Sequence, residues 1–369
     1  MESTNRKLPM AACRRPALVR RAPRPAFCAL RPAFTLIELL VAVTIMGILA
    51  SITLFALSGA LESAKGDKTR ATINKLNSLV MAKYESYRTR RVPITIPTGT
   101  STQLAAQYRV DAIRDLMRME MPDRYSDIQD NPTTHSIAGV STSSLIAVPS
   151  ATQAYRAALP AAPNFHAEAA KCLYLFISHG LDDPDVMSQF SEDEIARDSL
   201  DGMRYFVDGW GQPIYFIRWA PGFSSPLQPW NVNPTDALGN PTAKATFITS
   251  HDPFDPLKVY VPTTASDPFY NPGLPANAQF YPALYPLIIS GGPDKITDIY
   301  FNGIPNGGGT EFQYSKTSPP NNPYVVVNNG LFGAPTDLSS IFTPAGLSQG
   351  DGVDNSIDNI TNHDLSDTQ

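Results

Sequence analysis

The fold is decided by the stretch Phe34-Thr35-Leu36-Ile37-Glu38-Leu39-Leu40-Val41-Ala42-Val43, which opens a segment long enough to cross a membrane. From Leu39 to Leu61, 23 consecutive residues carry no charge, and Leu, Ile, Val and Ala dominate among them. At about 1.5 Å per residue, a helix of this length covers a hydrocarbon core of about 30 Å. We therefore predict a transmembrane helix that begins near residue 34.

Charge is distributed unevenly on the two sides of Phe34. The first 33 residues hold eight Lys/Arg and one acidic residue, whereas the remaining 336 hold 21 basic and 33 acidic residues. Basic residues before an apolar span favour a cytoplasmic N-terminus, so the body should be exported. A body with a net charge of −12 repels phosphate backbones, and general nucleic-acid binding is therefore not expected.

Two simpler interpretations of the apolar segment remain open. Small residues at Ala56, Ser58 and Ala60 suit a signal peptidase, and a plain membrane anchor has the same apolar length. The apolar run, however, exceeds the roughly 7–15 residues of an ordinary signal peptide, and a helical pattern continues through the candidate cut. Neither interpretation explains Glu38, because an unpaired acid in hydrocarbon costs about 2.5–3.5 kcal/mol on insertion scales.

The run Phe-Thr-Leu-Ile-Glu-Leu-Leu behind a basic leader resembles the class III signal of type IV pilins and type II secretion pseudopilins. The resemblance implies cleavage between Ala33 and Phe34 by a prepilin peptidase, N-methylation of the new Phe34 amine, and assembly into a filament with other pilin or pseudopilin subunits. Ala33 departs from the Gly that usually precedes the cut. Glu38 would neutralise the Phe34 amine of a neighbouring subunit; the alternative is a hydrated Glu38 at the level of the lipid headgroups.

The resemblance also implies a location. Before assembly the chain would be a single-pass protein among the lipids of the bacterial inner membrane, with a cytoplasmic N-terminus and an exported body. After assembly it would belong to a periplasmic or extracellular filament.

The helix is predicted to continue beyond the membrane. No proline occurs between Glu62 and Arg91, and Val92-Pro93 ends the pattern. One apolar stripe repeats at spacings of three and four: Ile73, Leu76, Val80, Tyr84 and Tyr87. Residues 34–91 therefore predict one helix of roughly 87 Å, apolar all round in its first half and amphipathic in its second.

The following region, 92–200, predicts a helical and loop insertion. Helical periodicity occurs at 102–120, 166–178 and 191–200, and the polar stretch 130–152 is typical of a loop.

Strand patterns appear after residue 200. Residues 204–207 and 214–219 predict a hairpin around Asp208-Gly209-Trp210-Gly211-Gln212-Pro213. This turn is similar to an Asp-Pro-Trp-Gly-Asn-Pro segment of major pseudopilins, with Gly209 in place of Pro. Trp210 is expected to be a structural plug between hairpin and helix, and a ligand platform is the alternative. Residues 221–282 hold 12 prolines and predict a loop insertion that packs on the body through its aromatic residues.

A calcium site is the one cofactor that the sequence suggests. Residues 285–299 resemble a calcium loop of pseudopilins, with Asp294 and Asp298 at the acidic positions. Calcium takes 6–8 oxygen ligands, so these two carboxylates need further donors, and a solvated turn explains them equally well. Residues 324–327 predict a last strand, and the acids of 350–359 do not match the spacing of an EF-hand.

Taken together, the patterns predict an α+β fold, in which a long N-terminal helix packs on a small antiparallel sheet with helical and Pro-rich loop insertions. Cys172 is the lone cysteine after the leader and is expected to be an inert buried thiol. The sequence holds no Gly-x-Ser-x-Gly, His-Glu-x-x-His or phosphate-loop motif, and a filament subunit is the main hypothesis. The alternatives are a minor pilin or adhesin-type binding subunit and, less favoured, a membrane-anchored exported enzyme, whose catalytic residues would have to converge from distant parts of the chain. The predicted segments are a leader (1–33), an assembly helix (34–61), its amphipathic continuation (62–91), the insertion (92–200), the sheet (201–345) and an acidic polar tail (346–369).

Overall fold

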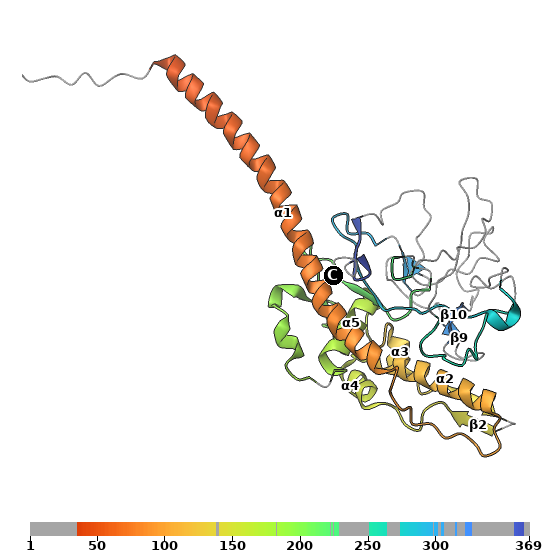
Figure 1. Cartoon of the computed structure of the whole chain (residues 1–369). Coiled ribbons are helices and arrows are strands. Elements are labelled where there is room, and N and C mark those ends of the chain that lie inside the picture. The colour runs from red at the N-terminus through yellow and green to blue at the C-terminus, as the bar shows by residue number, and fades with distance from the viewer. Residues whose placement is uncertain are drawn as a thin grey trace, which may run out of the picture. The chain divides into compact units, whose positions relative to one another are not determined.

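The computed structural model describes residues 35–137, 140–181, 183–221, 223, 225–228, 251–263, 274–297, 299–301, 304–305, 314–315, 322–326 and 358–364. The chain divides into two compact units, Met1–Ala56 and Leu57–Gln369. One helix, α1 (Leu36–Ser86), runs through the boundary between them (Figure 1).

The predicted long helix is confirmed, but α1 ends five residues before Arg91. Beyond Ser86 the backbone tightens into turns, because the amides of Arg88 and Arg90 bond to carbonyls three residues back, those of Glu85 and Tyr87. Such short-range bonds commonly satisfy the last carbonyls of a helix. The helix therefore ends through its own terminal turn before Val92-Pro93 is reached.

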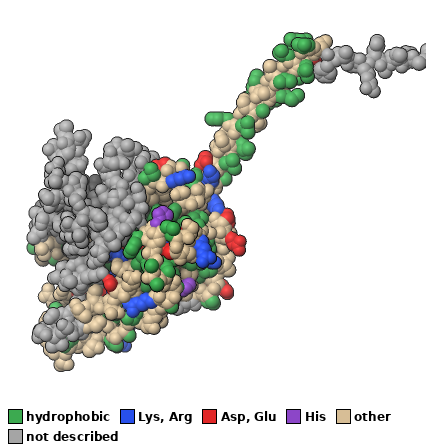
Figure 2. All heavy atoms as spheres, turned by 180° about the vertical axis from the view of Figure 1, so that it is seen from behind, with side chains coloured by type: hydrophobic (Ala, Val, Ile, Leu, Met, Phe, Trp, Pro, Cys, Tyr) green, Lys and Arg blue, Asp and Glu red, His purple; other side chains and the backbone are tan. Residues whose placement is uncertain are grey.

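The two halves of α1 differ as the sequence predicted. Between Leu36 and Leu61, 15 large apolar side chains are 45–83 % exposed, and hydrophobic side chains lie along this part of the helix in Figure 2. In the second half and the first residue after it, the predicted apolar stripe is buried, with at most 2 % exposure: Ile73, Leu76, Val80, Tyr84 and Tyr87.

Helices follow α1 along the chain. They are α2 (Thr102–Glu120), α3 (Tyr125–Gln129), α4 (Ser150–Ala158) and α5 (Glu168–His179). The predictions at 102–120 and 166–178 are confirmed. The Ser101 hydroxyl accepts a hydrogen bond from the Leu104 amide, which explains why α2 begins at Thr102.

Two predictions in this region were wrong. The stretch 130–152 is not a loop, because it holds a hairpin of β1 (Thr134–Ile137) and β2 (Val140–Ser143) and the start of α4. The stretch 191–200 holds only the short 3₁₀ turn η2 (Glu192–Glu194) and then β3 (Ile195–Arg197). The capping pattern at Ser191 is real, but pairing of β3 with β4 (Arg204–Phe206) overrides helix formation. A further 3₁₀ turn, η1, spans Val186–Gln189.

The central sheet has three antiparallel strands in the order β11-β6-β5. Strand β6 (Leu287–Ser290) lies in the middle, with β5 (Tyr215–Ile217) on one side and β11 (Ile360–Thr361) on the other. In this register Phe216 faces Ile288, and Ile360 faces Ser290.

The predicted hairpin of 204–207 with 214–219 needs correction. Strands β4 and β5 belong to different sheets, and the two runs meet only at the bridge between Val207 and Pro213 and at the bond from the Ile214 amide to the Phe206 carbonyl (2.9 Å). Pro213 has no amide hydrogen, so the ladder cannot extend through it.

The predicted polar tail also needs correction. Residues 358–364 are described, and they add β11 to the sheet instead of remaining in solvent. Asn362 fixes this segment, because its side chain accepts the Ile288 amide (2.8 Å) and donates to the Asn77 side chain on α1 (2.8 Å).

The remaining described elements are short. Strand β10 (Asn322–Val326), which overlaps the predicted last strand, pairs with β9 (Tyr314–Ser315), and β7 (Tyr300–Phe301) pairs with β8 (Ile304–Pro305). Within the described part of 221–282, the regular structure is the 3₁₀ turn η3 (Ala276–Ala278) and a bridge between His251 and Pro282.

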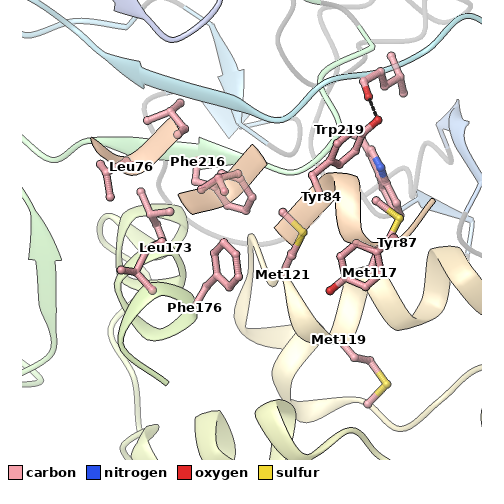
Figure 3. Close-up of a cluster of buried hydrophobic side chains, with 14 of the residues drawn as sticks. Leu76, Tyr84, Tyr87, Met117, Met119, Met121, Leu173, Phe176, Phe216 and Trp219 are labelled. Carbon is pink, nitrogen blue, oxygen red and sulfur yellow. Dashed lines mark hydrogen bonds between the residues drawn. The ribbon is translucent and has the colours of Figure 1, made fainter. Parts of the chain in front are cut away.

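The core lies between α1, α5 and the sheet (Figure 3). The rings of Phe176 on α5 and Phe216 on β5 stack with centroids 6.2 Å apart, and Leu76 of α1 and Leu173 belong to the same cluster. Phe254 of the Pro-rich segment packs edge-on against Tyr84 at 5.2 Å. The chain therefore has the predicted α+β fold, a long apolar N-terminal helix with a small antiparallel sheet and several helices.

Candidate functional site

The N-terminus of α1 is organised by Thr35 and Glu38. The amide and the hydroxyl of Thr35 both donate to Glu38 Oε2 (2.9 Å each), and the Glu38 amide donates to Thr35 Oγ1 (3.2 Å). This reciprocal pair is a capping box, which satisfies amides that a helix otherwise leaves unpaired. The Thr-x-x-Glu spacing of a capping box is present in the sequence, but no capping box was predicted there.

The capping box fixes the carboxylate of Glu38 at the positive end of the helix dipole. Its Oε2 accepts both bonds from Thr35, while no residue in the described ranges donates to Oε1. Among the described residues, Oε2 is therefore the Glu38 oxygen that the start of the helix uses. Ala33 and Phe34, the predicted processing residues, lie outside the described residues.

The part of α1 that follows Glu38 is apolar on all sides and could lie in a membrane. By length and composition, α1 is the one helix among the described residues that could cross a membrane. In the most apolar 18 residues of α1, no residue is buried by the rest of the described protein. Such a surface requires lipid or another protein around it.

Comparison with known proteins identifies this segment. Residues 31–54 match the prokaryotic N-terminal methylation motif. The chain carries a prepilin-type N-terminal signal. The signal supports a type IV pilin-like or pseudopilin-like protein and a structural subunit rather than an enzyme. No curated protein and no solved structure matches the chain.

Behind the prepilin-type signal, α1 is held to the body by the turn after β4. The Gly209 amide donates to Thr69 Oγ1 (2.9 Å), and a Cβ added to Gly209 would lie 2.3 Å from the Lys65 carbonyl oxygen. This contact gives a physical reason for Gly209, since a proline there would supply a Cβ and remove the donated hydrogen. The predicted role of Trp210 agrees with its contacts, because its indole Nε1 donates to Glu62 on α1 (2.7 Å).

A second polar contact between α1 and the body centres on Glu194. Thr72 donates to Glu194 Oε1 (2.6 Å), and Lys75 forms an ion pair with the same oxygen (2.9 Å). Burial by itself raises the pKa of Glu194, but the bonds from Thr72, the Ser191 amide and Lys75 outweigh it and lower the pKa to about 2. The second half of α1 is therefore bound to the body through charge as well as apolar packing.

The suggested calcium loop is only partly described, because Asp298 lies outside the described residues. Asp294 is exposed, and its carboxylate accepts the Ile296 amide two residues on (2.9 Å), as in an ordinary Asx turn. Its amide donates to the carboxylate of Asp358 (3.3 Å), an acid of the predicted polar tail. The described residues contain no group of three or more His, Cys, Asp or Glu side chains that could hold a metal.

Two further reactive side chains are held in structural roles. Cys172 is fully buried, as predicted, and burial raises the pKa of its thiol well above the usual range. His363 Nδ1 bonds to Ser225 Oγ (2.8 Å) and its Nε2 to the Pro286 carbonyl (3.1 Å), which ties the C-terminal segment to two loops. Burial lowers the pKa of His363 to about 4, so the ring is neutral at pH 7.

Proposed function

We propose that this chain is a structural subunit of a type IV pilus-like or type II secretion pseudopilus filament. The observation that carries the proposal is the Glu38 carboxylate, fixed at the start of an apolar helix inside the matched methylation motif. The basic leader of 33 residues stays in the cytoplasm, a prepilin peptidase cleaves between Ala33 and Phe34, and the Phe34 amine is methylated.

Assembly then brings α1 helices of neighbouring subunits together. Their apolar halves leave the lipid and pack against one another. The amine of Phe34 on one subunit then meets Glu38 on the next. In an apolar environment an unpaired charge is costly, so this pairing fixes the position of each incoming helix. The bonds that Thr35 makes use Oε2 of Glu38, and no donor to Oε1 occurs among the described residues, which supports this step.

Mass spectrometry of the purified protein tests processing. The mature chain should begin at Phe34 and be heavier by one N-terminal methyl group, whereas a host without the peptidase should retain Met1. An N-terminus near residue 60 would instead show that the segment is an ordinary signal peptide, and would overturn the proposal. Quantifying the protein in sheared filaments then separates a principal subunit from a rare one.

A minor pilin or adhesin-type binding subunit is the second candidate. Its support is the Pro-rich insertion, whose described part is packed on the body by Phe254 and Tyr281. A segment packed in this way can present a constant binding surface, which a free linker cannot. Few copies per filament, with filaments still formed when the gene is deleted, would favour this function over a principal subunit.

A further inference from the structure

A groove of about 520 Å³ lies beyond the C-terminal end of α1, within the unit Leu57–Gln369. It is formed by three segments: residues 87–96, the first half of α2, and residues 253–259 of the Pro-rich insertion. This volume is in the range of sites that hold ligands, roughly 300–1,000 Å³.

The interior of the groove is apolar. Val110 and Ile113 of α2 form a buried wall, and the half-buried Ile94 faces the groove from the segment after α1. Leu257, from the Pro-rich insertion, is 68 % exposed. A large aliphatic side chain left exposed beside an apolar groove suits contact with another apolar group.

Four arginines border this interior: Arg88, Arg90, Arg91 and Arg109. Arg90 is engaged by Glu120 in a bidentate pair (2.5 and 2.7 Å), and Arg88 pairs with Glu85 (2.9 Å). Arg91 and Arg109 are exposed and form no ion pair with any residue in the described ranges. As far as the described residues extend, these two guanidinium groups are the cations that the groove offers to a ligand.

Among the described lining residues, the one carboxylate is that of Asp255, and it does not pair with these cations. Its two oxygens accept the amides of Val259 and Tyr260 (2.8 Å each), so it shapes the turn of its own segment. The helix dipole of α1 explains basic residues just after Ser86, but it does not explain Arg109, which lies within α2. On a body of net charge −12, this grouping of arginines indicates an anionic ligand.

We propose that the groove binds an acidic segment of a partner protein, in which an aliphatic or aromatic side chain lies between carboxylates. The apolar side chain fills the interior beside Val110 and Leu257, and the carboxylates meet Arg91 and Arg109 at the border. Guanidinium groups suit this task because they bind carboxylates in a bidentate manner. This inference goes beyond the proposed filament role and does not depend on it.

A lipid headgroup fits the position less well. From Glu62, just past the apolar run, to Ser86, α1 extends about 36 Å, and the groove lies beyond that end. The attraction of basic side chains to an anionic membrane surface declines within a Debye length, about 8 Å at physiological salt. An acidic peptide needs no such proximity.

Fluorescence anisotropy tests the proposal with the full chain in nonionic detergent and a labelled octapeptide of alternating Asp and Leu. We expect saturable binding that weakens about tenfold when Asn replaces Asp in the peptide, since two exposed ion pairs together contribute about 1.4 kcal/mol. The variant Arg91→Gln/Arg109→Gln should lose a similar factor. Leu257→Ser should also weaken binding without changing the charge.

Arg204→Gln is the matched control, because Arg204 is an exposed arginine of β4 that does not line the groove. Arg90 is left unchanged, because its pairing with Glu120 joins the end of α1 to α2. Three results would overturn the proposal: no saturable binding, equal affinity for the Asn peptide, or an equal loss in the control. The full chain is also tested with phosphatidylglycerol vesicles. If it binds the vesicles but not the peptide, and the double variant abolishes vesicle binding, the groove binds lipid and the peptide proposal is refuted.

Discussion

Replacing Glu38 by Gln separates the two tasks that the structure gives this side chain. Glutamine at the same position retains an oxygen that can accept both bonds from Thr35, so the helix start should lose only a few tenths of a kcal/mol. The negative charge is lost, and the Phe34 amine of a neighbouring subunit then remains unpaired in an apolar environment. That cost is about 2.5–3.5 kcal/mol, which corresponds to a roughly 70- to 400-fold weaker incorporation.

The assay compares filament yield after shearing with the amount of processed protein in the membrane. For Glu38→Gln we expect normal insertion and a strong loss of filaments. Thr35→Ala is the matched variant, because it removes the cap, worth about 1 kcal/mol, and retains the charge, so it should assemble better than Glu38→Gln. Normal filaments in Glu38→Gln, or a larger defect in Thr35→Ala, would refute the assignment of charge pairing to Glu38.

Three further predictions concern the body. Gly209→Ala should destabilise it by about 1–3 kcal/mol, because the new Cβ meets the backbone of α1, whereas Gly59→Ala, with no atom within 4 Å, should not; urea unfolding measures both. As pH falls from 6.5 to about 4, His363 gains a proton in the unfolded state but not in the folded state, where it is buried. The free energy of unfolding of the wild type should therefore fall by roughly 3 kcal/mol relative to that of His363→Gln. Parallel curves of stability against pH for the two proteins would contradict this. If Asp294 and Asp298 bind calcium, the thermal midpoint should rise with calcium relative to chelator, and equal midpoints would favour the solvated turn.

The sequence predicted those parts of the fold that depend on local pattern. The stripe from Ile73 to Tyr87 and helix α2 follow from periodicity, and both are where the pattern placed them. The stretch 191–200 failed because its outcome depends on a partner: β3 pairs with β4, and this pairing overrides the helical signal of Ser191. The strand β11 failed for the same reason, since a polar sequence becomes a strand only when β6 is beside it.

The candidate site divides along similar lines. The capping box of Thr35 and Glu38 is a four-residue pattern and could have been found from the sequence alone. The close approach of Gly209 to Lys65 could not, because it joins two residues 144 positions apart in the chain whose distance only the fold determines. The same holds for Arg109, which becomes part of an arginine-lined groove only when α2 lies beside the end of α1.

Contacts along α1 also explain why its apolar run ends at Leu61. Leu36–Leu61 extends about 39 Å as a helix, enough to cross a hydrocarbon core of about 30 Å with a few residues at the interface. Glu62, the next residue, already accepts the indole of Trp210, and Gly66 is the first buried residue of α1. A shorter run would draw charged residues and the body's polar loops toward hydrocarbon, at a cost of about 2.5–3.5 kcal/mol for each central charge. A longer run would leave apolar side chains in the positions where Thr69 and Thr72 now bond to the body. Two requirements thus fix the end of the apolar run at Leu61: the thickness of the membrane and the polar contacts that the following residues make with the body.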